Sequence, residues 1–212
     1  MSVFELSRNS VHPQGAAFAR DFGVMNMPSL FPAGAEIYAQ GEKSGNLYKV
    51  EFGAVRIYRL LADGRRQISA FHLPGEVFGF EADRTHHFFA DAVGATGISI
   101  LRANASGGDA ASELLPLALL SLVRAQEHLL VLGRQNATER IAAFLTDMSA
   151  RQGGLRQIDL PMSRADIADY LGLTIETVSR VFSKLKQRGI IKLASLRRIE
   201  IARWQTLHEM AA

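Results

Sequence analysis

The chain of 212 residues contains no cysteine. Disulfide bonds, thiolate zinc sites and cysteine-bound iron–sulfur clusters are therefore excluded for this chain. A response to oxygen or to oxidants through one of its own thiols is excluded for the same reason.

Long hydrophobic runs are also lacking. The longest, Leu114 to Val123, is interrupted by Pro116 and Ser121 and is shorter than the ~20 residues that cross a bilayer. The first residues, MSVFELSRNS, have no charged start followed by an apolar core, so no secretory signal is visible. We therefore expect a soluble, cytoplasmic protein.

Recognisable catalytic patterns are lacking too, because no Ser/His/Asp set, obvious carboxylate pair or phosphate-cradling glycine loop is present. His86 and His87 are adjacent, so on a strand they would point to opposite faces and would not readily share one metal ion. A polar loop is the simpler interpretation of this pair. The other histidines are scattered at His12, His72, His128 and His208. The sequence predicts neither an enzyme nor a metal or cofactor site.

Positive charge is unevenly distributed, although the net charge is only +3. From Gln152 onward ten Lys or Arg face six Asp or Glu, whereas the preceding part has 14 basic and 15 acidic residues. With 48% hydrophobic residues the chain can form one large domain or two smaller ones, and we favour two. The pattern indicates a basic C-terminal module that binds a polyanion, attached to a nearly neutral body.

The segment from Pro161 to Ile190 predicts two short helices joined by a tight turn. Ser163 is expected to cap the first helix and Thr174 the second, since a hydroxyl can accept a backbone N–H left free in a first helical turn. Gly172 permits the sharp turn between them. The expected apolar faces consist of Ile167, Ala168 and Leu171 on the first helix and Ile175, Val178, Phe182 and Leu185 on the second.

The opposite face of the second helix is polar and can reach base edges in a DNA major groove. Its outward side chains are Glu176, Ser179 and Arg180. An alternative is a surface helix hairpin whose charges are merely solvated. Three basic residues continue the same helix: Lys184, Lys186 and Arg188. These charges, and two short strands expected at residues 190–193 and 197–201, favour a winged helix-turn-helix.

The part from Leu30 to Ala103 predicts many short strands separated by glycines. Asp63 and Gly64 stand between a strand around Val55 and a second strand from Gln67 to Leu73, as in a tight hairpin. An antiparallel roll or barrel is the expected architecture.

A long helix is predicted from Ser112 to Asn136, with Pro116 tolerated in its first turns. One seam follows spacings of four and three, through Leu115, Leu119, Leu122, Gln126 and Leu129. Such a seam favours a partner helix. The alternative is packing on the chain's own strands through Leu114, Leu117, Leu120 and Val123. Both arrangements are compatible with one helix.

Taken with the helix-turn-helix, four further motifs resemble the CRP/FNR superfamily of bacterial transcription regulators. The outward trio matches the FNR-type signature. Within the superfamily the chain looks most like the FixK regulators of nitrogen-fixing bacteria, over residues 30–203. The matching motifs are EIYAQGE at Glu36 to Glu42, GAVRIYRL at Gly53 to Leu60, HLPGEVFGFEA at His72 to Ala82 and ERIAAFL at Glu139 to Leu145.

The resemblance implies an α+β fold with an N-terminal antiparallel β-roll, similar to cyclic-nucleotide-binding and cupin-like domains, a long dimerisation helix and a C-terminal winged helix-turn-helix. The expected divisions are an N-terminal tail at 1–29, the roll at 30–110, the dimerisation helix at 111–136 and the DNA-binding domain at 137–212.

The resemblance also implies a homodimer that binds an inverted repeat of the form TTGA, a short spacer, TCAA, and that contacts RNA polymerase as an activator. Arg180 is expected to contact guanine, Glu176 the paired cytosine and Ser179 the neighbouring thymine. The expected phosphate contacts are Arg164, Thr174 and Thr177, with Lys184 and Lys186 as further candidates. Promoters for microaerobic respiration and nitrogen fixation are the implied targets.

Gating by a cyclic nucleotide is the main alternative. Alignment with the family places Phe80 where the ribose-binding glutamate belongs, and Phe88 and Phe89 near the phosphate-binding arginine and serine. Without a cation, a buried phosphate is costly, and Arg84 is the nearest substitute. We therefore expect a regulator without an obligatory effector. A scaffolding roll, or an enzyme that carries a helix-turn-helix, has no support in the sequence.

Overall fold

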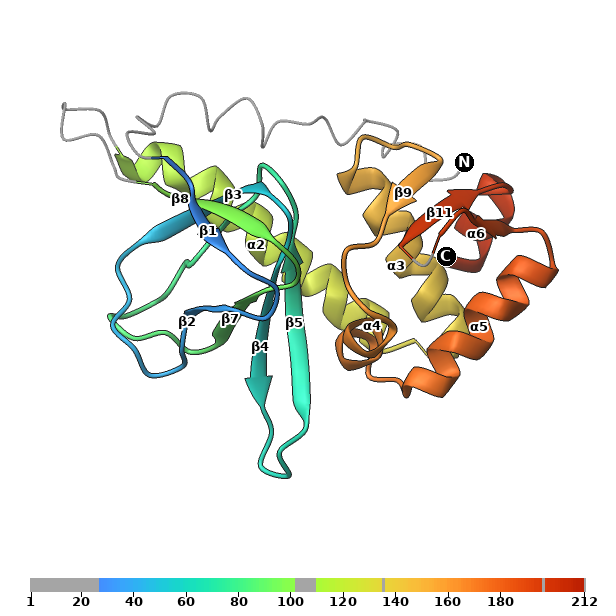
Figure 1. The fold of residues 1–212 in the computed structure, drawn as a ribbon, viewed down its shortest axis with the longest axis horizontal. Helices are drawn as coiled ribbons and strands as arrows, with labels where there is room; N and C mark the ends of the chain where they lie inside the picture. Colours follow the sequence, from blue (N-terminus) through green and yellow to red (C-terminus); the bar gives the residue numbers. More distant parts are fainter. Residues whose placement is uncertain (1–26, 102–109, 135, 196, 212) are drawn as a thin grey trace, which may run out of the picture.

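The computed structural model describes residues 27–101, 110–134, 136–195 and 197–211. Strands fill the N-terminal half, a long helix crosses behind them, and helices with a small sheet form the C-terminal half (Figure 1). The predicted tail lies outside the described residues up to position 26, as do residues 102–109 of the predicted roll and residue 135 of the predicted helix.

The N-terminal half is a roll of two four-stranded antiparallel sheets, with strand orders β1-β8-β3-β6 and β2-β7-β4-β5. Its strands are β1 (Ser29–Phe31), β2 (Glu36–Tyr38), β3 (Leu47–Phe52), β4 (Val55–Leu60), β5 (Arg66–His72), β6 (Val77–Phe78), β7 (Phe89–Ala92) and β8 (Thr96–Leu101). Alternate residues of these strands enclose a core that includes Val50, Val55 and Ile98. The predicted antiparallel roll is confirmed.

The longest hairpin of the roll joins β4 and β5 and projects beyond the rest of the roll (Figure 1). Leu60 pairs with Arg66 at its closed end, and Gly64 adopts φ +81° in the turn, a left-handed conformation that suits glycine. The hairpin predicted from Asp63 and Gly64 is therefore confirmed. The second strand begins at Arg66, one residue before the predicted start, and ends at His72.

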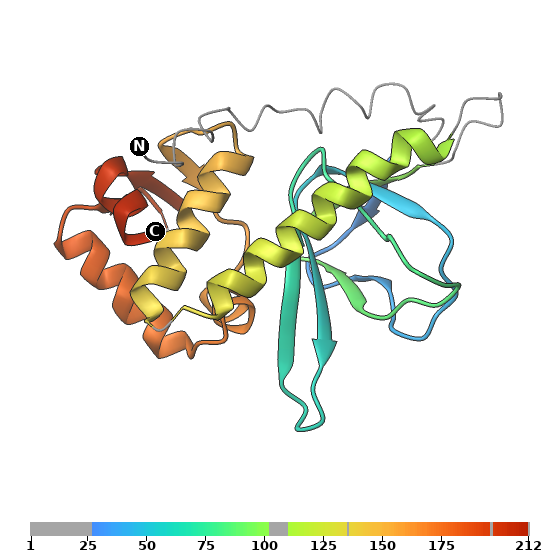
Figure 2. The same cartoon turned by 180° about the vertical axis from the view of Figure 1, so that it is seen from behind.

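The long helix α2 spans Ala110–Leu132 and runs along the back of the roll toward the C-terminal half (Figure 2). The prediction that it extends to Asn136 is wrong. Asn136 instead caps the next helix, because its side chain accepts the backbone N–H of Glu139 at 2.9 Å. The helix continues through Pro116, and all five predicted seam residues lie within it.

The C-terminal half comprises α3 (Ala137–Arg151), β9 (Gln157–Asp159), α4 (Arg164–Leu171), α5 (Ile175–Gln187), β10 (Ile191–Leu193), β11 (Arg198–Ile201) and α6 (Trp204–Ala211). The small sheet has the order β10-β11-β9. The two predicted wing strands are therefore present. The third strand β9 and the final helix α6 were not predicted, because three residues of strand and eight of helix give little periodic signal.

The two halves share a continuous hydrophobic core. Ile68 and Phe71 of β5 belong to the same buried cluster as Phe144 of α3 and Leu171 of α4. The ring of Phe71 lies 5.1 Å from the ring of Tyr170 on α4. The strand β5 therefore packs directly against the helix-turn-helix and places it relative to the roll.

Candidate DNA-binding surface

The first helix of the helix-turn-helix, α4, begins with a reciprocal cap. The backbone N–H of Asp166 donates to Ser163 Oγ at 3.0 Å, and the backbone N–H of Ser163 donates to Asp166 Oδ2 at 3.0 Å. Two donors left free by the helix start are thereby satisfied. The predicted role of Ser163 as a cap is confirmed.

The turn between α4 and α5 has the predicted form. Gly172 adopts φ 62° and ψ 42°, a left-handed conformation that ends α4. Thr174 then caps α5, since its hydroxyl accepts the backbone N–H of Thr177 at 3.2 Å. Arg140 of α3 donates to the carbonyl oxygen of Leu171 at 3.0 Å and so supports the end of α4 from outside.

The inward face of α5 packs on the core through Val178, Val181, Phe182 and Leu185. The prediction that Ile175 belongs to this face is wrong, because 44% of its surface is exposed. Ile175 is the first residue of α5, and the buried set begins one turn later at Val178. The first turn of α5 thus projects beyond the packed core.

The outward face of α5 carries the predicted trio. Glu176, Ser179 and Arg180 are all exposed and lie in the first two turns of the helix. Backbone and Thr174 hydrogen bonds at the helix start lower the pKa of Glu176, so this carboxylate is a hydrogen-bond acceptor at neutral pH. The guanidinium of Arg180 approaches only the Thr177 hydroxyl among the contacts described, at 3.5 Å. The trio is therefore available to a ligand.

The predicted phosphate-contacting residues fall into two groups. Thr174, Lys184 and Lys186 are exposed along α5, and the hydroxyls of Thr174 and Thr177 lie 3.1 Å apart. Arg164 is different, because its guanidinium carbon lies 3.4 Å from the centre of the Phe182 ring. Burial lowers the pKa of Arg164 to about 10, which leaves it charged at neutral pH. Four of the five residues lie on the two helices of the helix-turn-helix, and Thr174 caps the second helix.

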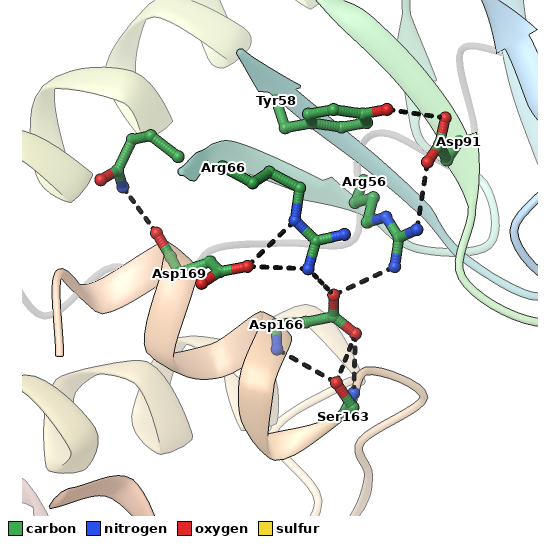
Figure 3. A network of polar contacts seen from close by, with 8 residues as sticks. Arg56, Tyr58, Arg66, Asp91, Ser163, Asp166 and Asp169 are labelled. Carbon is green, nitrogen blue, oxygen red and sulfur yellow. Dashed lines mark hydrogen bonds and ion pairs between the residues drawn. The ribbon is translucent and has the colours of Figure 1, made fainter. Parts of the chain in front are cut away.

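The sequence did not predict a second role for Asp166. Its carboxylate also accepts hydrogen bonds from Arg56 and Arg66 of the β4–β5 hairpin (Figure 3). These residues are separated by 110 and 100 positions in the chain, so no local pattern could reveal the contact.

His128 of α2 is buried between the two halves. Its ring stacks on Tyr170 of α4 with centroids 3.9 Å apart. Neither ring nitrogen has a hydrogen-bond partner among the described residues, and burial lowers the pKa of His128 to about 4. The surrounding small cavity is lined by charged side chains that include Arg124, Asp147 and Arg151.

Acidification is expected to destabilise the protein through His128. Above its ordinary pKa of 6.5 the imidazole is neutral in both the folded and the unfolded protein, so it does not change the free energy of unfolding with pH. Between pH 6.5 and about pH 4 the unfolded chain gains the proton and the folded protein does not, so the unfolded state is favoured. Between pH 7 and pH 5 the free energy of unfolding should fall by about 2 kcal/mol from this group. Urea denaturation at both pH values measures the loss.

The matched variant for this prediction is His128→Phe, which retains the ring stacked on Tyr170 and removes the titration. Between the two pH values, the free energy of unfolding of this variant should fall by about 2 kcal/mol less than that of the parent. An identical loss in both proteins would show that His128 does not titrate between them. His72, whose pKa burial also lowers to about 4, remains in both proteins and serves as a constant background.

The side chains of Phe80, Phe88 and Phe89 pack against neighbouring side chains of the structure. Phe80 packs against the cluster of Val77, Leu101 and Leu117. The guanidinium of Arg59 lies 4.8 Å from the centre of the Phe88 ring, and Phe89 stacks on Tyr58 at 5.3 Å. Arg84 is exposed in a loop. The chemistry of these positions does not fit a buried cyclic phosphate.

The polar loop predicted for the adjacent histidines His86 and His87 is confirmed. Both lie before β7 in a loop, and their Nδ1 atoms lie 3.1 Å (His86) and 2.9 Å (His87) from the carboxylate oxygens of Glu81. His86 is buried and stacks on Tyr38 at 3.7 Å. Within the described ranges, no group of three or more His, Cys, Asp or Glu side chains could hold a metal ion.

Two domain families match the sequence. Residues 139–210 match the Crp-like helix-turn-helix domain, and residues 29–106 match the cyclic nucleotide-binding domain. These ranges correspond to the C-terminal half that carries α4 and α5 and to the roll.

Several relatives are similar over most of the chain. The nitrogen fixation regulation protein FixK of Rhizobium meliloti is 58% identical over 183 residues, which are 86% of each chain. The FixK of Azorhizobium caulinodans is 42% identical over 206 residues, 92% of this chain and 83% of the relative. The structure of FixK2 from Bradyrhizobium japonicum is 40% identical, covers 89% of this chain and 98% of its own, and superposes with a TM-score of 0.81.

The segment Ser112–Leu132 of α2 is, by length and composition alone, long and apolar enough to cross a membrane. Arg124 and His128 interrupt the apolar sequence of this helix, and both side chains face the protein: Arg124 pairs with Glu76 and His128 is buried. A DNA-binding family implies a soluble protein, so the exposed apolar side of α2 is not a membrane span.

The relatives that match across both halves are transcription regulators, a family without enzymatic activity. The chain belongs to the CRP/FNR family as a transcription regulator with a helix-turn-helix DNA-binding domain, and it closely matches the FixK proteins.

Proposed function

We propose that the protein binds, as a homodimer, an inverted repeat of the form TTGA, a short spacer, TCAA, and that it does so without an obligatory small-molecule effector. The observation that carries the proposal is the two-sided character of α5. Its inward face is buried in the core, whereas Glu176, Ser179 and Arg180 are exposed together near its N-terminal end. The N-terminal turns of a recognition helix are those that contact bases in this class of motif.

Each member of the trio suits one partner in the major groove. Arg180 can donate two hydrogen bonds to the O6 and N7 acceptors of guanine, and Glu176 can accept from the amino group of the paired cytosine. Ser179 is short enough to contact the neighbouring thymine. One arginine and one carboxylate side by side therefore favour a G·C pair in each half-site.

Phosphate contacts would hold the helix in register. Thr174 and Thr177 lie at the N-terminal end of α5, where the helix dipole and two neighbouring hydroxyl groups favour an anion. Lys184 and Lys186 extend the positive charge along the helix. Arg164, stacked on Phe182, would present a guanidinium whose position is already fixed.

Dimerisation would use the exposed seam of α2. The large apolar side chains that the described chain leaves uncovered on this helix are Leu115, Leu119, Leu122, Val123, Leu129 and Leu130. Gln126 is exposed on the same side. A second copy of α2, related by a two-fold axis, would cover this surface and place two α5 helices about one turn of DNA apart, ~34 Å.

The packed phenylalanines of the roll support independence from cyclic nucleotides. Phe80, Phe88 and Phe89 supply neither the acceptor for a ribose nor the cation for a phosphate. The alternative is a regulator gated by a cyclic nucleotide or by another ligand. A binding experiment without and with added cyclic nucleotide distinguishes effector-independent binding from gating by a cyclic nucleotide.

The names of the relatives indicate the biological setting. Since the FixK proteins are nitrogen fixation regulation proteins, we propose that this cytoplasmic protein regulates genes of the same process, through contact with RNA polymerase and with activation as its main effect.

Fluorescence anisotropy with the purified, ligand-free protein tests the proposal. A duplex with TTGA and TCAA should bind at least about 10³-fold more tightly than a scrambled duplex at the same salt concentration, as for a sequence-specific regulator. Equal affinity for both duplexes would contradict the proposal. Selective binding only after a cyclic nucleotide is added would replace it with the ligand-gated alternative.

Replacing Arg180 with alanine should weaken specific binding by about 1 to 3 kcal/mol per half-site, since a bidentate arginine–guanine contact has that strength. Preference should relax at one base pair of each half-site and remain unchanged elsewhere. Binding to duplexes substituted at each position in turn measures the change.

The matched comparison is Lys184→Ala on the same helix. As the loss of a phosphate contact, it should weaken all sequences alike and reduce the steepness of the salt dependence. If Arg180→Ala and Lys184→Ala had the same effect on every duplex, Arg180 would be a phosphate contact and not a base contact.

A further inference from the structure

Ion pairs connect the β4–β5 hairpin of the roll with α4 of the helix-turn-helix (Figure 3). Arg66 donates to Asp169 Oδ2 through Nε at 3.0 Å and through Nη2 at 2.8 Å. The same Nη2 donates to Asp166 Oδ1 at 2.6 Å. Arg56 donates to that oxygen through Nη1 at 3.0 Å. Two strands of the roll thus hold one helix of the DNA-binding half.

Asp166 is the centre of this cluster. Only 6% of its side-chain surface is exposed. One carboxylate oxygen accepts from the backbone N–H and the hydroxyl of Ser163, and the other accepts from the two arginines. Burial alone would raise the pKa of Asp166, but the Ser163 donors and the arginines lower it, so the carboxylate is ionised at neutral pH.

The arginines are themselves held in place by the roll and by α4. The Nη2 atom of Arg56 donates to Asp91 Oδ2 on β7 at 3.0 Å, and Tyr58 donates to the other oxygen of Asp91 at 3.4 Å. Arg66 reaches from the start of β5, and the next residue, Gln67, donates to the Asp169 carbonyl oxygen at 2.6 Å. The hairpin therefore meets α4 with charged and amide donors whose directions are fixed.

A second connection lies on another side of the same interface. Arg151 of α3 donates to Glu76 at 3.0 and 2.7 Å and to the carbonyl oxygen of Phe71 at 2.5 Å. Arg124 of α2 lies 3.1 Å from the same glutamate. Two separate contacts, on α3 and on α4, oppose rotation of the DNA-binding half about the α2–α3 connection.

We infer that Arg56 and Arg66 are positioning residues for DNA recognition: they fix the orientation of α4, and through Gly172 that of α5, relative to the roll and α2. The inference depends on the proposed function, because a fixed orientation matters for DNA only when two α5 helices read two half-sites. The contacts that make this connection join residues of the chain itself.

The double variant Arg56→Gln and Arg66→Gln, assayed on a series of inverted repeats with spacers lengthened or shortened one base pair at a time, tests the inference. The parent protein should prefer one spacer length. In the variant, the ratio of Kd values between other spacers and the preferred spacer should fall at least about fivefold, because the lost coupling is of that order. Its preference for TTGA over a substituted half-site should be unchanged.

The matched control is Arg65→Gln. Arg65 is adjacent to Arg66 and also pairs with an aspartate, but its partner is Asp63 of the same exposed turn. The control should keep the spacer preference of the parent. If the double variant binds the duplexes of all spacer lengths more weakly by the same factor, it has lost only folded protein. That result, or an unchanged spacer preference, would overturn the inference.

A milder variant and a DNA-independent measurement complete the test. If circular dichroism shows that the double variant is unfolded, Asp169→Asn removes one ion pair with Arg66 without changing the cap of α4, and it should show the same weakened preference for one spacer length.

Because the chain has no cysteine, spin labels can be placed at Ala62→Cys and Gln205→Cys, with labelled protein diluted in unlabelled protein. A distance distribution that is no broader in the variant than in the parent would overturn the inference, whereas a parent that selects no repeat would overturn only the proposed function.

Discussion

Replacing Asp166 with alanine is expected to lower the free energy of unfolding by about 3 kcal/mol or more. Removing one partner of a buried ion pair leaves the opposite charge uncompensated, at a cost of about 3 to 5 kcal/mol. Loss of the helix cap adds to this cost. Arg56 retains Asp91 and Arg66 retains Asp169, so the lower end of the range is expected. Urea denaturation followed by circular dichroism measures the change.

The control for this prediction is Asp159→Ala. Asp159 also pairs with an arginine, Arg198, at 2.9 Å, but 63% of the aspartate side-chain surface is exposed. Exposed ion pairs contribute little to stability because water screens them. Similar losses from the two substitutions would show that the buried cluster has no special role in holding the halves together.

Introducing a charge into the α2 seam is expected to have the largest effect on DNA binding. In Leu122→Glu a carboxylate replaces an exposed leucine at the centre of the predicted dimer interface. Two such charges brought together in an apolar interface would dissociate the dimer. Operator affinity should then fall by about 10²-fold or more, since each half-site would be bound separately. Sedimentation velocity and anisotropy measure the two effects.

Leu61→Glu provides the comparison. Leu61 is also an exposed leucine, but it lies at the tip of the β4–β5 hairpin, away from α2. This variant should remain a dimer with unchanged operator affinity in the purified system. If the Leu122→Glu variant remained a dimer with the operator affinity of the parent, the α2 seam would not be the dimer interface.

Features set by neighbouring residues were predictable from the sequence. Ser163, Gly172 and Thr174 have the predicted local roles, because caps and a left-handed turn depend on a few consecutive residues. The β4–β5 hairpin follows from a turn pair between two strand-forming segments. The outward trio follows from helical periodicity on a helix whose other face is buried.

Features set by distant partners were not predictable. Periodicity assigns Ile175 to the inward face, but only the packed structure shows that the core begins one turn later. The loop around His86 and His87 was predicted, but the Glu81 carboxylate that both rings contact was not. The attachment of α4 to the roll joins residues about a hundred positions apart, and a single sequence contains no sign of it.

Selection of bound duplexes from a random pool, with the full chain and no added ligand, shows which DNA sequence the protein recognises by itself. We expect the enriched sequences to converge on TTGA and TCAA as an inverted repeat with one spacer length. Enrichment of no sequence, or of a single unpaired half-site, would contradict this expectation.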